Sequence, residues 1–570
     1  MKKYLLVLVS LCCALLPALA EHPEYPELKK SDANIIGHVL DKKTSEHLPY
    51  ITIALKGTTI GTVTDATGHY FLKNLPEGNF VMEVSSVGYK TVTRNVTLKK
   101  GKTLEENFEL EEDAIALDGV VVSANRSETT RRLAPTLVNV VDLKLFETTN
   151  SSTLSQGLNF QPGVRVETNC QNCGFQQVRI NGLDGPYTQI LIDSRPVFSA
   201  LSGVYGLEQI PASMIERVEV MRGGGSALFG SSAIAGTINI ITKEPLRNSG
   251  QLSHTITSIG GSSAFDNNTS LNASLVTDDH RAGLYIFGQN RHRSGYDYDG
   301  DGFTELPKLK NQTVGFRSYL KTSTYSKLTF EYHHMQEFRR GGDMLDRPPH
   351  EAHIAEQLQH SIDGGSLKYD YFSPNEKNRL SVFASAANTD RDSYYGPGND
   401  PLKAYGKTTD LTAMGGVQYV HTFDKCLFMP SDLTAGLEYN RDRLKDNMWG
   451  YDRHTDQTVK VYSAFLQNEW KNKHWGILIG GRLDKHNMVD DVIFSPRANL
   501  RFNPTDNINL RLSYSSGFRA PQAFDEDMHI ENVGGTVAMI ERAKDLKEEK
   551  SQSFSASADM YHRFGAFQTN

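Results

Sequence analysis

The side chains best spaced for joint chemistry are two cysteines, in the segment Cys170-Gln171-Asn172-Cys173. Such a pair can form half of a zinc site, a redox couple or a small disulfide loop. Zinc would need a second ligand pair, and none stands nearby at the usual spacing. Thioredoxin-type redox chemistry would need a surrounding βαβ unit, which the sequence does not predict here. Because the chain carries an export signal, described below, we predict a disulfide between Cys170 and Cys173.

A second set of candidate ligands lies in the acidic loop from Tyr296 to Glu305. Asp297, Asp299 and Asp301 occupy alternate positions next to glycines, an arrangement that wraps oxygen ligands around Ca²⁺. The full EF-hand pattern fails, because its twelfth position is Lys308 rather than glutamate. The loop is therefore either a calcium site or a solvated acidic segment.

Two further motifs do not complete the chemistry that they suggest. His350-Glu351-Ala352-His353 is one residue short of the H-E-x-x-H zinc protease motif. Gly223-Gly224-Gly225 is not followed by the Lys-Ser/Thr of a phosphate-binding loop. No catalytic constellation appears elsewhere, so we expect no enzyme activity and no required cofactor.

The amino-acid composition excludes some classes of protein. The 570 residues include 60 Lys+Arg and 67 Asp+Glu, a net charge of −7, which argues against nucleic-acid binding. Only 38% of the residues are hydrophobic, which excludes a bundle of membrane helices. Strands that alternate apolar and polar residues can nevertheless cross a membrane while the chain scores as hydrophilic.

The first twenty residues predict export. Lys2 and Lys3 precede an apolar run from Tyr4 to Leu16, and Ala18-Leu19-Ala20 is a typical cleavage signal. A lipoprotein signal ending at Cys12 or Cys13 is the alternative, but neither cysteine follows a small residue. We expect cleavage near Ala20.

Residues 32–111 predict a small β-sandwich of about seven short strands. Its motifs follow one another in order: Gly37-His38-Val39, Thr64 to Tyr70, Leu75-Pro76-Glu77-Gly78 and Val87-Gly88-Tyr89. This series resembles the carboxypeptidase regulatory-like domain, and the resemblance implies a non-catalytic module.

Residues 114–132 contain an isolated valine run between polar linkers. Such a strand suits pairing with the sheet edge of another protein, or forms an edge strand of the neighbouring domain. The residues of this run are Asp118, Gly119, Val120, Val121, Val122, Ser123 and Ala124.

Residues 133–245 carry the most specific pattern of the chain. Ile210-Pro211 opens a series that runs through Met214-Ile215-Glu216-Arg217-Val218-Glu219-Val220 and Ser226-Ala227-Leu228-Phe229-Gly230 to Gly236-Thr237-Ile238-Asn239-Ile240. It closely resembles the plug domain of TonB-dependent outer-membrane receptors. The resemblance implies that residues 118–124 are the TonB box, which pairs with the periplasmic domain of TonB in the TonB-ExbB-ExbD system.

Residues 246–570 alternate with the period of β-strands and predict about fourteen of them. Short turns on one side and long polar loops on the other are typical of an outer-membrane barrel. The expected fold class is therefore mainly β: a sandwich, then an α+β plug inside an antiparallel transmembrane β-barrel. The barrels of this family have about 22 strands, so we expect the C-terminal strands to be missing; a smaller closed barrel is the alternative.

The resemblance also implies candidate substrates. His529 lies between Gly517-Phe518-Arg519-Ala520-Pro521 and Asp545 to Glu549, where the haem receptors of this family place a ligand-binding histidine. The acidic loop instead resembles the calcium loop of the cobalamin receptors. We predict an outer-membrane importer of a scarce metal chelate (cobalamin, haem or ferric siderophore), in contact with outer-membrane lipids and a surface lipoprotein. A SusC-like glycan importer and a binding or signalling receptor without transport are the alternatives.

Overall fold

The computed structural model describes residues 30–569 apart from 50, 66, 87–88, 112–119, 125, 127–128, 171, 196–207, 209, 231–232, 397–400, 506, 531–538, 540, 544, 561 and 565–566. The predicted signal peptide, residues 1–20, lies outside the described residues. Within the described part of the chain, no helix has the length and apolar character needed to cross a membrane.

The N-terminal domain is a sandwich of two sheets. Strand β1 lies between β4 and β7 and also pairs with β8, while the other sheet has the order β3-β2-β5-β6. Alternate residues point inward, so the sheets share an apolar core that includes Ile35, Ile53, Leu72 and Val84. The strands are β1 (Lys30–Asp41), β2 (Thr52–Leu55), β3 (Gly61–Val63), β4 (His69–Pro76), β5 (Gly78–Ser85), β6 (Val92–Leu98), β7 (Thr103–Glu105) and β8 (Phe108–Leu110).

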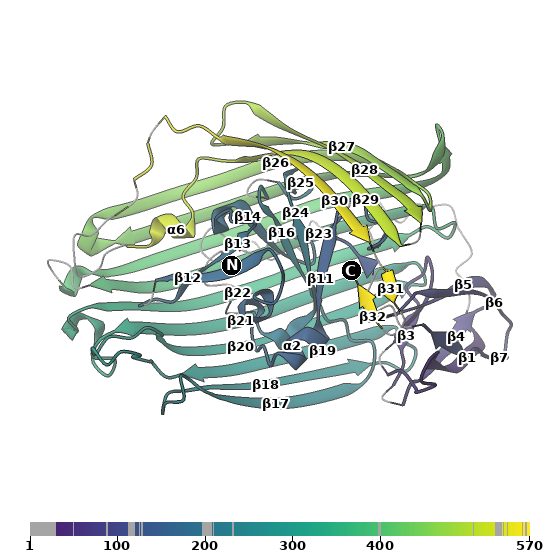
Figure 1. Ribbon diagram of the computed structural model, residues 1–570, viewed down its shortest axis with the longest axis horizontal. Coiled ribbons are helices and arrows are strands. Elements are labelled where there is room, and N and C mark those ends of the chain that lie inside the picture. Colours follow the sequence, from purple (N-terminus) through teal and green to yellow (C-terminus); the bar gives the residue numbers. More distant parts are fainter. Residues whose placement is uncertain are drawn as a thin grey trace.

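The second domain is a small α+β unit built around a four-stranded sheet of order β11-β15-β16-β14. Val218, Val220 and Met221 of strand β15 are buried, and the large sheet curves around the unit (Figure 1). Its elements are β9 (Val120–Val121), β10 (Thr129–Thr130), β11 (Val138–Asp142), α2 (Leu143–Thr148), α3 (Leu154–Leu158), β12 (Val164–Cys170), β13 (Phe175–Ile180), η1 (Gly185–Tyr187), β14 (Thr188–Ile192), η2 (Ala212–Met214), β15 (Ile215–Arg222), α5 (Ser226–Phe229) and β16 (Gly236–Thr242).

The third domain is a 14-stranded antiparallel sheet in which β17 to β30 pair in sequence order. Figure 1 shows this sheet curving around the second domain. Its strands are β17 (Ser249–Ser258), β18 (Phe265–Val276), β19 (Ala282–Arg293), β20 (Lys308–Ser323), β21 (Ser326–Gly342), β22 (Ala355–Phe372), β23 (Asn378–Gly396), β24 (Tyr405–Cys426), β25 (Met429–Met448), β26 (Arg453–Lys471), β27 (Trp475–His486), β28 (Val492–Thr505), β29 (Ile508–Arg519) and β30 (Glu549–Met560).

The two ends of the large sheet differ. The sandwich lies at the end with short turns (Figure 1), where the Thr59 amide donates a hydrogen bond of 2.9 Å to the Thr324 carbonyl in the turn between β20 and β21. The longer connections at the other end hold η3 (Pro349–Glu351), η4 (Pro401–Lys403), η5 (Trp449–Tyr451) and α6 (Asp525–Met528). A last hairpin joins β31 (His562–Phe564) and β32 (Phe567–Thr569).

The large sheet has its polarity inverted relative to a water-soluble sheet. Its exposed outer rows contain large apolar residues, among them Leu271, Ile286, Val314, Phe330, Leu437, Leu466, Ile479, Phe494, Leu512 and Phe554. Its buried inner rows contain polar and charged residues, among them Asn268, Gln289, Arg291, Asn311, Glu337, Arg339, Asp410, Asp446 and Asp484. An apolar outer band suits contact with lipid. The mainly β fold with a sandwich, a plug and a large antiparallel sheet is confirmed.

Candidate functional site

The candidate TonB box, residues 118–124, is docked on the plug over the part that the structure describes. Asp118 and Gly119 lie outside the described residues, but Val120 and Val121 form β9 and pair antiparallel with β10. Within the described residues, β9 thus pairs with β10, which lies within the same residues 114–132, and not with an edge of a neighbouring sheet.

One carboxylate holds the next two residues of this segment. The amides of Val122 and Ser123 each donate a hydrogen bond of 2.9 Å to Oε2 of Glu219, and the Ser123 hydroxyl donates another of 2.8 Å. Glu219 is fully buried on β15, where Nε of Arg217 lies 3.0 Å from its other oxygen. A charged acceptor strengthens each of these bonds, so Glu219 is the main polar anchor of the segment.

Apolar packing completes the docking. Val121 and Ala124 are fully buried in a cluster with Ala134 and Val138. From the wall of the large sheet, Nη2 of Arg497 donates a hydrogen bond of 3.1 Å to the Ala124 carbonyl. The segment therefore contacts both the plug and the wall that surrounds it.

The plug itself is fastened to the wall by buried ion pairs. Glu208 accepts from three guanidinium groups of the wall, those of Arg291 (3.4 Å), Arg293 (3.3 Å) and Arg339 (2.8 Å). Burial opposes the ionisation of Glu208, but the three positive charges prevail and lower its pKa to about 2.

A second ion network lies beside the docked segment. Glu438 of β25 pairs with Arg126 through one oxygen and with Arg482 of β27 through the other, the latter at 2.7 Å. Arg482 also pairs with Asp484 at 2.8 Å and donates to the Leu228 carbonyl of α5 at 3.2 Å. This network ties the chain just after residue 124 to the wall.

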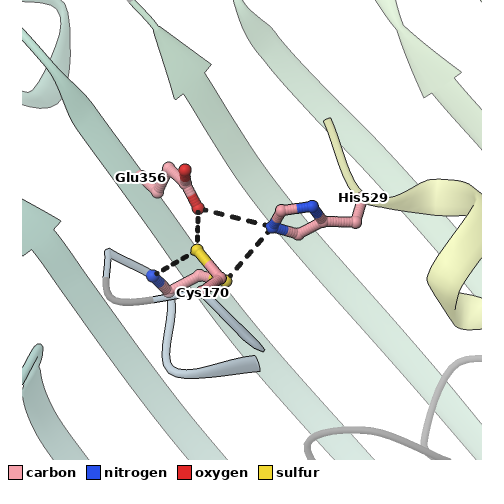
Figure 2. A group of neighbouring side chains, drawn as sticks. Cys170, Glu356 and His529 are labelled. Atoms are coloured by element: carbon pink, nitrogen blue, oxygen red, sulfur yellow. Dashed lines mark hydrogen bonds and ion pairs between the residues drawn. The ribbon is translucent and has the colours of Figure 1, made fainter. Parts of the chain in front are cut away.

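At the end of β12, the two predicted cysteines lie close to two residues from elsewhere in the chain; Figure 2 shows Cys170 with Glu356 and His529. The Cys170 thiol lies 3.2 Å from Oε2 of Glu356, near the start of β22. Nε2 of His529, which follows α6, lies 3.3 Å from Sγ of Cys173 and 3.6 Å from Oε2 of Glu356. The ligand atoms of all four side chains lie within 4.8 Å of one another.

No disulfide joins Cys170 and Cys173 in the structure, in contrast to the disulfide predicted from the sequence. A hydrogen bond from Cys173 lowers the pKa of Cys170 to about 7. Burial opposes a charge on His529, but its bonds to Cys170 and Glu356 outweigh that cost and raise its pKa to about 10. The predicted haem-binding histidine thus belongs to this buried cluster.

The acidic loop gathers a set of carboxylates that differs from the predicted one. Asp297, Asp299 and Glu305 bring their oxygens within 4.8 Å of one another, whereas Asp301 is outside this group. Asp297 accepts hydrogen bonds from the amides of Gly300 (2.7 Å) and Gly302 (2.9 Å), which fold the loop back on itself. The geometry replaces Asp301 with Glu305 as the third candidate calcium ligand.

Sequence reasoning missed Glu208, Glu219 and Glu356. The signal for Glu219 is its place between two valines, in Val218-Glu219-Val220. A charged side chain in such an apolar strand needs a partner, because burying an unpaired charge is costly. No local pattern distinguishes Glu208 or Glu356, because their partners come from distant strands.

Comparisons with known proteins place each domain. The CarboxypepD_reg-like domain model matches residues 35–122, the TonB-dependent Receptor Plug Domain model matches 130–237, and the TonB dependent receptor-like, beta-barrel model matches 240–570. Among solved structures, the siderophore receptor PirA from Acinetobacter baumannii aligns with a TM-score of 0.65 at 18% identity, over 77% of this chain and 69% of that one. The alcaligin outer-membrane receptor FauA from Bordetella pertussis aligns with a TM-score of 0.58 at 14% identity, over 77% and 70%.

Curated relatives are similar over most of this chain. The vitamin B12 transporter BtuB of Vibrio vulnificus (strain CMCP6) is 24% identical over 424 residues, 72% of this chain and 64% of that protein. The ferric enterobactin receptor of Pseudomonas aeruginosa is 23% identical over 480 residues, 71% of this chain and 61% of that protein. The chain thus spans less than two thirds of the length of either relative. With the beta-barrel family model matching more than half of its residues, this chain belongs to the TonB-dependent receptor family.

Proposed function

We propose that this protein is an outer-membrane receptor that imports a metal chelate, with energy supplied by TonB. The observation that carries the proposal is the docked segment. Residues 120–124 are bonded to the plug inside the large sheet, so a pull on this segment would act on the plug. The similarity to a vitamin B12 transporter and a ferric enterobactin receptor supports a chelate as the cargo. Among chelates we propose a cobalamin, a haem or a ferric siderophore.

The inverted polarity of the large sheet supports the proposed location in the outer membrane. Its outer rows are apolar and its inner rows are charged, which suits a cylinder with lipid outside and a polar plug inside. We place the long connections with α6 at the cell surface and the sandwich in the periplasm, because the short turns of such barrels face the periplasm.

TonB would act on the box segment by β-augmentation. A strand of TonB would pair with the backbone of residues 118–124. In the structure the backbone amides of Val122 and Ser123 instead donate to Glu219. Engagement therefore requires the segment to leave Glu219, and a pull on the released segment would act on the plug.

Deletion of Asp118 to Ala124 tests the proposal. Cells would be limited in turn for cobalamin, haem and a ferric siderophore, and uptake and surface binding of each labelled chelate would be measured. We expect uptake of one chelate to fall to the level of a receptor-null strain while its surface binding and the receptor level persist.

Three outcomes would contradict the proposal. Equal loss of binding and uptake would give the segment a structural role, and unchanged uptake would leave a receptor without TonB-driven transport. Growth dependence on an oligosaccharide, with no effect of any chelate, would favour a SusC-like glycan importer instead.

A further inference from the structure

The cluster of Cys170, Cys173, Glu356 and His529 joins three separate parts of the fold. The cysteines bracket the turn between β12 and β13 of the plug, Glu356 lies in the wall, and His529 follows α6 in an outer connection (Figure 2). In Figure 1, β12 and α6 lie towards the end of the large sheet away from the sandwich. Four side chains from three segments thus converge on one point.

Their chemical types match one class of ion. Thiolate sulfur, imidazole nitrogen and carboxylate oxygen are together the ligands of Zn²⁺. Mg²⁺ and Ca²⁺ favour oxygen ligands alone, so the two sulfurs argue against them.

The spacing matches tetrahedral coordination. With Zn–S of about 2.3 Å and Zn–N or Zn–O of about 2.0 Å, a tetrahedron places sulfur roughly 3.5 Å from nitrogen or oxygen, and nitrogen roughly 3.3 Å from oxygen. The corresponding distances here are 3.2 Å from Cys170 to Glu356, 3.3 Å from Cys173 to His529 and 3.6 Å from His529 to Glu356. These three distances fit a zinc site, and all four ligand atoms lie within 4.8 Å of one another.

The surroundings are those of a closed site. Cys173 is fully buried and Glu356 is 3% exposed. An apolar cluster of Leu358, Tyr395, Met448 and Ile530 encloses Cys173, and the Tyr395 ring meets the His529 ring edge-on with centroids 5.5 Å apart. Zn²⁺ would bind these groups as two thiolates, a carboxylate and a neutral imidazole, and its charge would offset the cost of burying the three negative charges.

We propose that Cys170, Cys173, Glu356 and His529 bind one Zn²⁺ ion, which fastens the outer connection after β29 to the plug and the wall. Four protein ligands leave no open coordination position, which is the arrangement of a structural ion. The inference stands apart from the proposed transport, because it concerns an ion resident in the receptor. A Cys170–Cys173 disulfide is the competing state, in which Glu356 and His529 would keep their ion pair of 3.6 Å but could not share a metal ion with the two sulfurs.

The test uses the full-length receptor purified in detergent after treatment with a chelator under reducing conditions. Zn²⁺ is added, unbound ion is removed, and bound metal is counted by mass spectrometry; Co²⁺ is added in parallel to detect thiolate-to-cobalt charge-transfer bands. We expect one ion per chain and those bands for the wild type. Cys173→Ser and His529→Ala should each weaken binding by more than about 100-fold, the upper range seen for residues that merely orient metal ligands.

Matched controls separate this site from adventitious binding. Cys426→Ser removes the remaining cysteine of the exported chain and should keep full binding. His38, His47 and His69 gather on the sandwich with ring centroids 4.7 to 5.7 Å apart, so all variants are made in a His47→Ala background.

A second measurement needs no variant and so does not depend on mutant folding. Zn²⁺ should protect the wild-type thiols of Cys170 and Cys173 from an alkylating reagent, and should protect the chain near His529 from proteolysis. The proposal is overturned if the wild type binds no Zn²⁺, if both variants bind it as the wild type does, or if receptor trapped directly from cells carries a Cys170–Cys173 disulfide.

Discussion

The sandwich and the unit of plug and wall are both built mainly of β-strands, yet they bury opposite kinds of side chain. The sandwich buries an apolar core that includes Ile35, Ile53 and Val84. The wall buries charged residues such as Glu337, Arg339 and Asp484 against the plug. Each hydrogen bond to a charged group contributes only about 1.5–3 kcal/mol net, since water can replace it. The hydrogen bonds of a polar interface can therefore be replaced by water one at a time. We expect the plug to move relative to the wall, and we expect the core of the sandwich to stay fixed.

The largest expected effect concerns the interface of plug and wall. Glu208→Gln leaves three buried guanidinium groups without their shared charge and should lower the free energy of unfolding by about 3–5 kcal/mol. Denaturant unfolding of the purified receptor measures this loss, and influx of a large antibiotic reports a loosened plug. Asp184→Asn is the control, because it removes a plug carboxylate that is 53% exposed, and it should cost less than about 1 kcal/mol.

The same carboxylate gives a pH dependence of known sign. Its pKa is lowered from 4.5 to about 2 in the folded state, so its stabilisation is complete above pH 4.5 and is lost as the pH falls towards 2. This amounts to about 3 kcal/mol. Glu208→Gln should lack this component, and an identical acid sensitivity of variant and wild type would contradict the assignment.

A core substitution in the sandwich tests the other side of the comparison. Ile53→Ala creates a cavity in an apolar core and should destabilise the sandwich by about 2–5 kcal/mol. The effect should stay within that domain, so the heat-resistant gel migration of the large sheet should not change. Thr52→Ala, on the same strand, is the milder control. A loss of heat resistance in Ile53→Ala would show that the two regions are not independent.

A substitution on the outer face tests the inverted polarity. Ile479 of β27 is 56% exposed, and Ile479→Arg should cost about 2–4 kcal/mol if that face meets lipid near the middle of the membrane. Refolding into lipid vesicles followed by denaturant titration measures the cost, with Ile479→Val as the control. A neutral effect of arginine would mean that this row faces water.

The smallest expected effect lies in the acidic loop, where polar groups meet solvent. Millimolar Ca²⁺, but not Mg²⁺, should raise the free energy of unfolding by about 1–3 kcal/mol for a weak extracellular site. Glu305→Gln should abolish this gain, whereas Asp301→Asn should keep it, since Asp301 lies outside the carboxylate group. Loss of the calcium effect in Asp301→Asn but not in Glu305→Gln would instead support the ligands predicted from the sequence, which include Asp301.

Much of the fold was predictable because its causes are local. Strand alternation reports which face is buried, and the motif from Ile210 to Ile240 is specific for the plug. The sites were harder to predict from the sequence. Cys170 and Cys173 are visible as a pair, but Glu356 and His529 lie 186 and 356 residues from their cysteine partners. Only the curvature and register of the large sheet bring them together, and a single sequence does not encode that geometry in any short pattern.

The place of Glu219 within the plug determines where an external force would first be felt. Its strand, β15, is flanked by β11 on one side and β16 on the other, so it is an inner strand of the four-stranded sheet. Tension on Ser123 would load the middle of that sheet before it reaches either margin. In the proposed role of residues 118–124 as the TonB box, a pull on the segment while it is still bonded to Glu219 would therefore reach an inner strand of the plug sheet first.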